Sequence, residues 1–502
     1  MKKKTALCLL LSLLAAAGGA LSACGETAAA PSEQTAPTEN SAAVTEAVTE
    51  PAEYVSTGKD YGGETVTVSA VDYYTTGNRG VWRAQDYCEV FSNGENGDAL
   101  NDGIYRRMVL VQEELNVKLA LYSVDSFDNL VNDFRKPVMA GESVFDIAMM
   151  ASNRLPSLLG TQMLVDLNTI PGVDFSHTWW DQTAREELTL FGQMYAATGD
   201  ISLYISYAPI TYFFNKQVVE TLDLENPYQL VRDGKWTLDK AIEMSRQTAA
   251  DLNGDGVMNP LDDRYGMCLE AASMYYTVAG CGLRLTTHTD DGVQLAVSTD
   301  KTEAVTSKMQ EFMNDANVNV SNGKIKLGYS NNFVELMLPM FKENRALFFN
   351  NQILVALNLR DMDANFGILP PPKADEQQKD YCCPINDFWG MFATVPVTNT
   401  RLELTGDVLE AMGYYGQQVL TPAFIETTVR GKSLRDGDSA EMMELIFANR
   451  VYDMGSFYDW GGVKSMFATI ADSPNSKFSS TFAKSESKIQ KAIDKTIAEL
   501  EG

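Results

Sequence analysis

The sequence predicts a mixed α/β fold, and two observations lead to this prediction. The chain has 502 residues, 45% of them hydrophobic, which is enough to bury one large core and to build two or three domains. Short β-branched and apolar runs alternate with segments of helical periodicity in the order strand, helix, strand, helix, strand. Such alternation predicts a mostly parallel sheet whose loops gather at the carboxyl ends of the strands.

The first 23 residues have the pattern of an export signal. Three lysines at positions 2–4 precede an apolar run that extends from about residue 6 to residue 17. A few residues after this run come Leu21-Ser22-Ala23-Cys24, which resemble the lipobox of bacterial lipoproteins. We therefore expect residues 1–23 to be a signal peptide and Cys24 to be the lipid-modified mature N-terminus. The alternatives are an uncleaved transmembrane anchor and an ordinary secretory signal.

Residues 24–58 are expected to form a disordered tether. This segment is rich in Ala, Thr, Glu and Pro and has almost no large apolar side chains. Such a composition cannot bury enough surface to offset the entropy of folding. A lipid at Cys24 would hold the folded body near a membrane through this tether, because two or more acyl chains together bind stably.

The folded body begins with strands and helices that can be recognised from side-chain periodicity. Residues 65–71 (TVTVSAV) read as a strand, and a helix begins near Asp102, where Ile104, Met108, Val111 and Leu115 form one apolar face. Further along we expect a strand at 117–123, a helix at 129–139 and a buried strand at 144–150. Beyond these, Asn215-Lys216 starts a helix, Thr237 is an N-cap, and residues 489–500 form a closing amphipathic helix.

The net charge excludes a nucleic-acid-binding protein, and the cysteine spacing does not match a metal site. The formal net charge is -27, which excludes nucleic acid as a ligand. After Cys24 the sequence has five cysteines, and their spacing is not that of a metal site. Because five is an odd number, at least one of them must be unpaired unless it bridges another chain. They are Cys88, Cys268, Cys281, Cys382 and Cys383. We expect buried thiols rather than a disulfide framework.

Several motifs taken together resemble one family. In chain order they are the lipobox with its tether, GDALNDGIYRRM, VFDIAMM, LLGTQMLVDLNTIPGVDF followed by WWD, YFFNKQVVETL, GKWTLDKAIEM and FGILPPPK. This series is similar to the extracellular solute-binding lipoproteins of ATP-binding-cassette (ABC) importers, family 1, the carbohydrate type. The resemblance covers most of the chain.

The resemblance implies a two-lobed fold like that of the type II periplasmic binding proteins, with the lobes joined by hinge crossings. Lobe 1 would comprise residues 59–207 and 388–453, and lobe 2 residues 208–387 and 454–502. It further implies a monomer that captures a sugar or oligosaccharide between the lobes and delivers it to the transmembrane subunits of an ABC permease. Two alternatives stay open: a binder of another solute, such as a peptide or polyamine, and a surface adhesin that binds carbohydrate.

A sugar cleft needs aromatic faces for the C–H surface of the ring and polar side chains for its hydroxyls. Both kinds of residue follow strands or stand at the crossings; Arg154 and Tyr276 adjoin two of them. The expected ligand-binding residues are Asp72, Tyr73, Tyr74, Ser152, Asn153, Asp200, Tyr204, Tyr275, Asn351, Trp389 and Trp460. The alternative for each Tyr and Trp is half-buried packing.

The stretch DLNGDGVMNPLD matches a calcium loop of the form D-x-[DN]-x-[DN]-G. Six residues fall at ligand positions, and Gly256 would make the sharp turn. They are Asp251, Asn253, Asp255, Val257 through its carbonyl, Asn259 and Asp262. Position twelve usually carries Glu, so the shorter Asp262, or Asp263 in its place, predicts weak, structural Ca²⁺ binding. The alternative is an Asx-rich turn without metal.

No catalytic constellation is recognisable. Only His177 and His288 are present, more than a hundred residues apart, and neither G-x-S-x-G nor H-E-x-x-H occurs. We therefore expect a binding protein rather than an enzyme.

Overall fold

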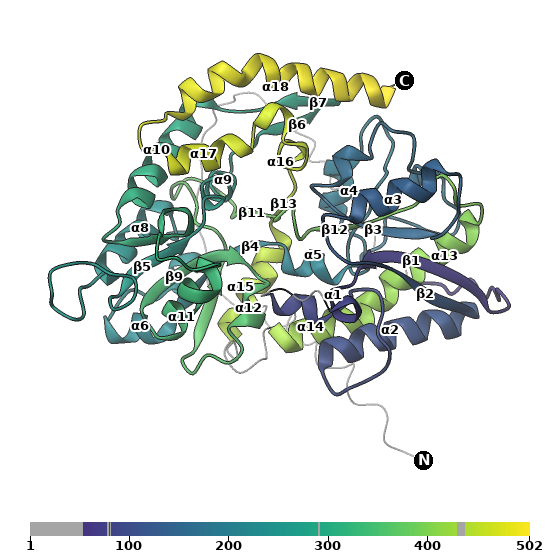
Figure 1. Cartoon of the computed structure of the whole chain (residues 1–502), viewed down its shortest axis with the longest axis horizontal. Helices are drawn as coiled ribbons and strands as arrows, with labels where there is room; N and C mark the ends of the chain where they lie inside the picture. The colour runs from purple at the N-terminus through teal and green to yellow at the C-terminus, as the bar shows by residue number, and fades with distance from the viewer. Residues whose placement is uncertain (1–53, 78–79, 81, 290–291, 429–436, 502) are drawn as a thin grey trace, which may run out of the picture. The chain divides into compact units, whose positions relative to one another are not determined.

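The computed structural model describes residues 54–501, except 78–79, 81, 290–291 and 429–436 (Figure 1). The expected signal peptide, Cys24 and the tether up to residue 53 lie outside the described residues. Tyr54, inside the range expected for the tether, already packs on the folded body. Its ring stacks on Tyr414 at 4.0 Å between centroids, and its hydroxyl donates to Glu114 at 2.5 Å.

The first sheet has four strands in the order β12-β3-β1-β2. β1 pairs in parallel with β2 and β3, and β12 pairs antiparallel with β3. The strands are β1 (Glu64–Val71), β2 (Val117–Val124), β3 (Ile147–Ala151) and β12 (Met391–Thr394). All five residues of β3 are buried, as expected for a strand covered on both faces. The three strands predicted from sequence in this region are confirmed, although β3 begins three residues later than expected.

Helix α2 (Ala99–Leu115) covers this sheet with the predicted apolar face. Ile104, Val111 and Leu115 are buried, and Asp98 caps the helix by accepting from the amides of Leu100 and Asn101 at 3.0 and 3.1 Å. α13 (Leu402–Tyr415) and α14 (Thr421–Thr428) pack against α2. Segments far apart in sequence therefore build one body around this sheet.

The second sheet has five strands in the order β10-β4-β9-β5-β8. They are β4 (Ile210–Asn215), β5 (Tyr265–Leu269), β8 (Asn319–Ser321), β9 (Ala346–Gln352) and β10 (Phe366–Leu369). β5 runs parallel to β8 and β9, whereas β4 runs antiparallel to β9 and β10. Every residue of β4, β5 and β9 is buried, so this sheet lies in the centre of its core. Two small ladders, β11 (Cys383–Pro384) with β13 (Arg450–Val451) and β6 (Thr286–Thr289) with β7 (Gly292–Leu295), complete the strands.

The remaining helices surround the two sheets (Figure 1). They are α1 (Tyr73–Thr76), α3 (Leu130–Met139), α4 (Gln182–Leu188), α5 (Leu203–Tyr207), α6 (Lys216–Thr221), α7 (Pro227–Arg232), α8 (Leu238–Thr248), α9 (Ser273–Gly280), α10 (Thr299–Asn314), α11 (Leu338–Lys342), α12 (Val355–Asn358), α15 (Gly437–Ala448), α16 (Met454–Tyr458), α17 (Ser465–Asp472) and α18 (Phe478–Glu501). The predicted helix start at Asn215-Lys216 and the predicted N-cap Thr237 are confirmed: Asn215 accepts from Val218 N and Thr237 from Lys240 N. The closing helix at 489–500 is confirmed as the last part of α18.

Helix α15 lies in the segment 388–453, which the resemblance assigns to lobe 1. It packs on β10 of the second sheet, and Arg232 of α7 pairs with Glu441 and with Asp438 of α15. The apolar side chains Met442 and Ile446 are buried in this packing. The segment 388–453 therefore reaches both sheets.

Two properties follow for the described part of the chain. The five cysteines are free thiols, four of them buried and Cys382 partly exposed. Within the described ranges, no helix combines the length and the apolar character needed to cross a membrane.

Candidate functional site

The candidate site centres on residues 386–389, here called the hub loop, which connect β11 to β12. The backbone carbonyl of Asp387 accepts from Ser152 Oγ at 2.7 Å and from Asn153 N at 3.0 Å. Ser152 and Asn153 directly follow β3, and β3 pairs with β12, so strand pairing brings the two segments together. This places three predicted ligand-binding residues, Ser152, Asn153 and Trp389, in one neighbourhood.

Trp389 is the centre of an aromatic cluster. Its ring centroid lies 5.2 Å from Phe127, 5.6 Å from Tyr204 and 6.0 Å from Trp82. Trp82 in turn lies 4.4 Å from Phe333, and Phe333 lies 5.5 Å from Phe349 of β9 in the second sheet. The cluster therefore joins aromatic side chains that flank both sheets, and it includes predicted residues Tyr204 and Trp389.

Lys464 adds a positive charge next to the hub loop. Its Nζ pairs with Asp387 at 2.6 Å and lies over the rings of Tyr275 and Tyr276 at 5.5 and 5.6 Å. Burial raises the pKa of Tyr275, which therefore remains a neutral phenol. The predicted residue Tyr275 thus reaches the hub loop through Lys464.

Asn351 reaches the hub loop through a chain of amides. Asn351 Oδ1 accepts from Gln352 N at 2.9 Å, and Gln352 Oε1 accepts from Asn386 Nδ2 at 2.6 Å. Asn351 and Gln352 are the last residues of β9, where a strand end can present side chains beyond the sheet.

Two buried amide atoms in this region have no hydrogen-bond partner among the described residues: Asn153 Oδ1 and Asn351 Nδ2. The first is an acceptor and the second a donor. Leaving a buried polar atom unpaired costs about 1–3 kcal/mol, so such atoms are rare unless a ligand or water satisfies them. A hydroxyl, which both donates and accepts, suits either atom.

Three predicted residues, Asp72, Asp200 and Trp460, lie elsewhere or have other partners. Asp72 is fully buried and caps α1, accepting from Thr75 N at 2.9 Å. Asp200 accepts from Thr421 at 2.5 Å and Gln417 at 3.2 Å. Trp460 is buried, stacks on Tyr458 at 4.3 Å and donates to Thr496 at 2.9 Å.

Tyr74 and Tyr73 point in different directions from α1. Tyr74 is 47% exposed, whereas Tyr73 is buried and its hydroxyl accepts from Phe127 N at 3.3 Å. Tyr73 therefore contacts the aromatic cluster through Phe127, whose ring centroid lies 5.9 Å from that of Tyr73.

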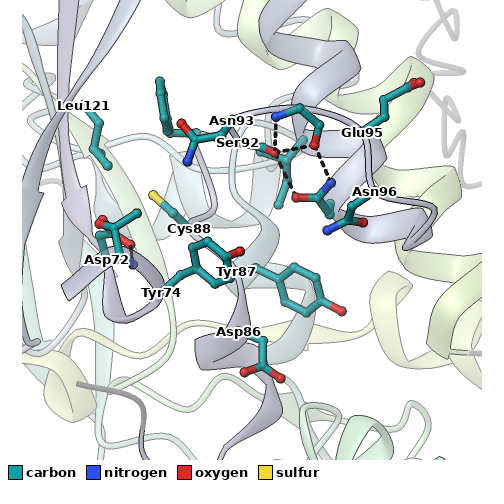
Figure 2. A pocket seen from close by; sticks show the side chains of 15 residues that line it. Asp72, Tyr74, Asp86, Tyr87, Cys88, Ser92, Asn93, Glu95, Asn96 and Leu121 are labelled. Carbon is teal, nitrogen blue, oxygen red and sulfur yellow. Dashed lines mark hydrogen bonds between the residues drawn. The ribbon is translucent and has the colours of Figure 1, made fainter. Parts of the chain in front are cut away.

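A separate cavity of about 290 Å³ lies between the end of β1, residues 86–96 and the start of α2. Figure 2 shows Asp72 and Leu121 on one side, Ser92, Asn93, Glu95 and Asn96 on the other, and Tyr74 and Tyr87 between them. We call it the α2 pocket. None of the hub-loop residues lines it.

Sequence reasoning missed several residues that build the hub. They are Trp82, Phe333, Gln352, Asn386, Asp387 and Lys464. Trp82 carried a signal, because it lies in the loop after the first strand. Lys464 and Phe333 carried none, since only tertiary packing brings them to this place.

A buried carboxylate, Glu89, hydrogen-bonds to the backbone of Tyr204 in the aromatic cluster. Glu89 is fully buried, and its Oε2 accepts from Ser202 Oγ at 2.7 Å and from Tyr204 N at 3.3 Å. Its Oε1 has no partner within the described ranges. Burial raises the pKa of Glu89 to about 7 and lowers that of its neighbour Arg107 to about 10.

The acidic stretch 251–263 forms an exposed loop between α8 and β5. Asp251 accepts from the amides of Gly254 and Gly256 at 2.6 and 2.7 Å, and both glycines have positive φ, at 74° and 82°. Asp263, not Asp262, is the buried carboxylate, and it accepts from Leu252 N at 2.8 Å and Asn259 N at 2.7 Å. Asp262 is exposed and accepts from Asn259 Nδ2.

Hydrogen bonds alone can thus hold this loop, while each carboxylate keeps further lone pairs for a cation. No cluster of three or more His, Cys, Asp or Glu side chains with metal-site geometry occurs in the described part of the chain. The predicted ligand set also includes three residues of other types: Asn253 and Asn259 through their side-chain oxygens, and Val257 through its backbone carbonyl.

Comparison with known proteins gives matches only at the level of structure. No family model matches the sequence, and no curated protein does. A cyclo/maltodextrin-binding protein complexed with maltotetraose has a TM-score of 0.56 at 12% identity, over 86% of this chain and 97% of that chain. The maltose-binding protein MalE from Listeria monocytogenes, with maltose, has a TM-score of 0.56 at 14% identity, over 86% and 98%.

A third structure is an ABC substrate-binding protein from Listeria monocytogenes in complex with cycloalternan. Its TM-score is 0.55 at 11% identity, over 86% of this chain and 99% of that chain. These structures match over nearly their full length, with TM-scores of 0.55 and 0.56, which confirms the fold expected from the sequence. The chain therefore has the two-domain α/β fold of the substrate-binding proteins of ABC importers.

Proposed function

We propose that the protein is the substrate-binding lipoprotein of an ABC importer and captures a sugar or oligosaccharide at the hub loop. The observation that carries the proposal is the pair of unsatisfied buried amide atoms, Asn153 Oδ1 and Asn351 Nδ2, near an aromatic cluster. Hydroxyl groups would satisfy both atoms, and aromatic rings provide the apolar faces that sugar rings need. The similar structures with maltose, maltotetraose and cycloalternan support this ligand class.

The mechanism is capture followed by delivery. Asn153 and Trp82 belong to segments around the first sheet, whereas Asn351, Phe333 and Tyr275 belong to segments around the second. A ligand that contacts both groups binds the closed arrangement more tightly than the open one and so shifts the population toward closure. The closed protein then docks on the permease.

The export signal, the lipobox at Cys24 and the acidic tether support an extracytoplasmic, lipid-anchored location. The partners would be the transmembrane permease subunits and the membrane surface, and the protein would act as a monomer. Globomycin inhibits lipoprotein signal cleavage, so a mass shift of the mature protein in treated cells, absent in Cys24→Ala, would test the anchor.

The ligand class is tested by calorimetry and thermal shift with maltose, maltotriose, cycloalternan, spermidine and a neutral tripeptide. Bound ligand raises the unfolding temperature according to RT ln(1 + [L]/Kd). We expect a saccharide to bind, Asn153→Ala to weaken it at least tenfold, and the exposed-site control Asn317→Ala to leave it unchanged. Binding of spermidine or peptide without any saccharide would contradict the proposal.

Closure has its own test. Small-angle scattering of the protein with and without the bound saccharide should show a smaller radius of gyration with ligand. An unchanged radius, with binding shown by calorimetry, would remove the capture mechanism while leaving sugar binding in place.

We further propose that the loop 251–263 binds Ca²⁺ weakly and structurally. The alternating oxygens of Asp251, Asn253 and Asp255 and the positive φ of Gly256 support it. No reaction step involves this ion. Melting in 5 mM CaCl₂ should occur above melting in EDTA, and Asp251→Asn with Asp255→Asn should abolish the difference; identical transitions of the unmodified protein would reject the site.

A further inference from the structure

The last helix, α18, carries a row of exposed lysines. Lys484, Lys488, Lys491 and Lys495 are spaced by four, three and four residues, and this spacing places all four on one face of a helix. All four are exposed. At about 1.5 Å of rise per residue, the row is about 16 Å long. We call these four residues the lysine face.

The opposite side of α18 fixes the direction in which the lysine face points. Phe482, Ile489 and Ile493 are buried, and the helix packs on α10, α17 and β7. α18 is one continuous helix, as Figure 1 shows, so its apolar and basic residues keep their angular relation along its whole length. A helix that buries one side in this way presents the other side to the solvent.

The positive charges of the lysine face are largely unneutralised. Lys484, Lys488 and Lys491 form no ion pair with a carboxylate of the described residues. Lys495 pairs with Glu499 at 3.4 Å, at the C-terminal end of the row. Both of these side chains are well exposed, and an exposed pair of this kind is weak.

Other surface lysines of this protein behave differently. Lys240 pairs with Glu225 at 2.8 Å, and Lys308 pairs with Asp239 at 2.6 Å. The chain has 67 Asp and Glu residues against 40 Lys and Arg residues, so a carboxylate is usually within reach of a surface lysine. A row of lysines without such partners is therefore a distinct basic patch on an acidic protein.

The composition of the patch indicates the kind of partner. None of the exposed large hydrophobic side chains of the described residues lies on α18, so the contact would be electrostatic and would not involve insertion of apolar groups. A straight row of positive charges is complementary to an extended anionic surface. Because the net charge of the chain is -27, such a surface repels most of the protein and favours the orientation that turns this face toward it.

We propose that the lysine face docks on the anionic phospholipid headgroups of the membrane and orients the folded body there. The proposal rests on the lipid anchor at Cys24 proposed above, because a tether makes the contact intramolecular, with an effective concentration in the range of about 1 mM. A contact that is weak in free solution is then sufficient. The docking goes beyond ligand capture, since it involves neither the hub loop nor a solute.

Lysine footprinting of the full lipoprotein, inserted into vesicles through its lipid, tests the docking. The protein is briefly acetylated with N-hydroxysuccinimide acetate, and mass spectrometry measures the acetylation of each lysine. Vesicles of phosphatidylcholine are compared with vesicles of equal parts phosphatidylcholine and phosphatidylglycerol. Lys379, whose side chain is 92% exposed, is the internal reference.

We expect acetylation of Lys488 and Lys491, relative to Lys379, to fall at least threefold on the anionic vesicles. It should recover in about 0.5 M NaCl, because salt screens attraction between exposed charges. Equal acetylation on the two kinds of vesicle would overturn the proposal. Protection by soluble polyglycerol phosphate, with none on vesicles, would assign the lysine face to a soluble polyanion and would also overturn it.

Two triple variants separate the lysine face from net charge. The first carries Lys484→Gln, Lys488→Gln and Lys491→Gln, which keep the helix propensity of α18 nearly unchanged. The control carries Lys118→Gln, Lys136→Gln and Lys235→Gln, at exposed positions in other segments. Lys495 reports on both: its protection should be lost in the first variant and kept in the control. Equal protection of Lys495 in the two variants would contradict docking through this face.

Flotation distinguishes failure of the anchor from failure of the docking. Protein that does not float with phosphatidylcholine vesicles lacks the proposed anchor. In that case the docking stands if the protein floats with the anionic vesicles and the lysine-face variant does not, and it falls if neither floats. Protein that floats with both kinds of vesicle, but without protection of Lys488 and Lys491, keeps the anchor and loses the docking.

Discussion

The hub loop and the acidic loop 251–263 are both surrounded by polar side chains, but the hydrogen-bonding groups of these side chains find partners to a different extent. In the acidic loop, Asp251 and Asp263 accept hydrogen bonds from backbone amides of the same loop. Around the hub loop, Asn153 Oδ1 and Asn351 Nδ2 are buried without a partner among the described residues. A polar segment that satisfies itself stabilises local structure, whereas a buried atom without a protein partner is available for a hydrogen bond to a water or a ligand.

The largest effect is expected at Glu89, the buried carboxylate under Tyr204. Its folded-state pKa of about 7 lies above the ordinary value of 4.5, so the protonated form stabilises the fold fully below pH 4.5, and this contribution is lost as pH rises through 7. Glu89→Gln mimics the protonated carboxyl. The variant should match the unmodified protein near pH 4.5 and exceed it by up to about 3 kcal/mol above pH 7.

Urea unfolding at pH 4.5, 6 and 8 measures this difference, with the exposed Glu376→Gln as the control. A difference in unfolding free energy that stays constant across these pH values would show that the pKa of Glu89 is the same in the folded and unfolded states.

The next largest effect is expected for the ion pair at the hub loop. Asp387→Asn leaves Lys464, whose side chain is 17% exposed, without its counter-charge, and should cost about 2 kcal/mol of unfolding free energy. Asp380→Asn removes a partner of Lys379 on the surface and should cost less than about 0.5 kcal/mol. Equal costs for the two variants in chemical denaturation would mean that the Asp387 pair behaves as a surface pair.

Within the acidic loop, two neighbouring aspartates should behave differently. Asp263→Ala removes an acceptor for two amides and should cost about 1–2 kcal/mol, measured by denaturation in EDTA. Asp262→Ala, at an exposed position, should cost less than about 0.5 kcal/mol in EDTA. If Asp262→Ala costs more in CaCl₂ than in EDTA, Asp262 is a calcium ligand; a larger cost than Asp263→Ala in EDTA would contradict the hydrogen-bond account.

The smallest effect on stability is expected at Asn153. Asn153→Ala removes an unpaired oxygen and should change the unfolding free energy by less than about 0.5 kcal/mol, while saccharide affinity falls. Ser152→Ala breaks the bond to the Asp387 carbonyl and should cost about 1 kcal/mol. Thermal melts without ligand separate the two; a greater loss for Asn153→Ala would show that its side chain is structural.

Much of the fold could be predicted because it depends on local patterns. The apolar face of α2, the β-branched β1 and the caps Asn215 and Thr237 are encoded within a few residues. β12 and its antiparallel pairing with β3 could not be derived from such patterns, because that pairing joins residues about 240 positions apart. In the first sheet, the expected parallel pairing is therefore confirmed for β1, β2 and β3, and β12 adds an antiparallel edge strand.

The candidate site was predictable only in part, for the same reason. Ser152 and Asn153 can be selected from the sequence because they follow a recognisable strand, and the structure brings both next to Asp387. Trp460 was selected as an aromatic residue near the C-terminus, but its indole packs beside α18, where it donates to Thr496. Asp387 contributes through its backbone carbonyl as well as its carboxylate, and a backbone group has no signature in a sequence.

The hub loop also limits the sequence changes that this protein could accept during evolution. Within four positions, Asn386 contacts the amide of Gln352, Asp387 contacts Lys464, and Trp389 contacts the aromatic cluster. One inserted or deleted residue would move all of these contacts out of register at once. Evolutionary change in ligand preference would therefore proceed by substituting the surrounding side chains, with the length of this segment held constant.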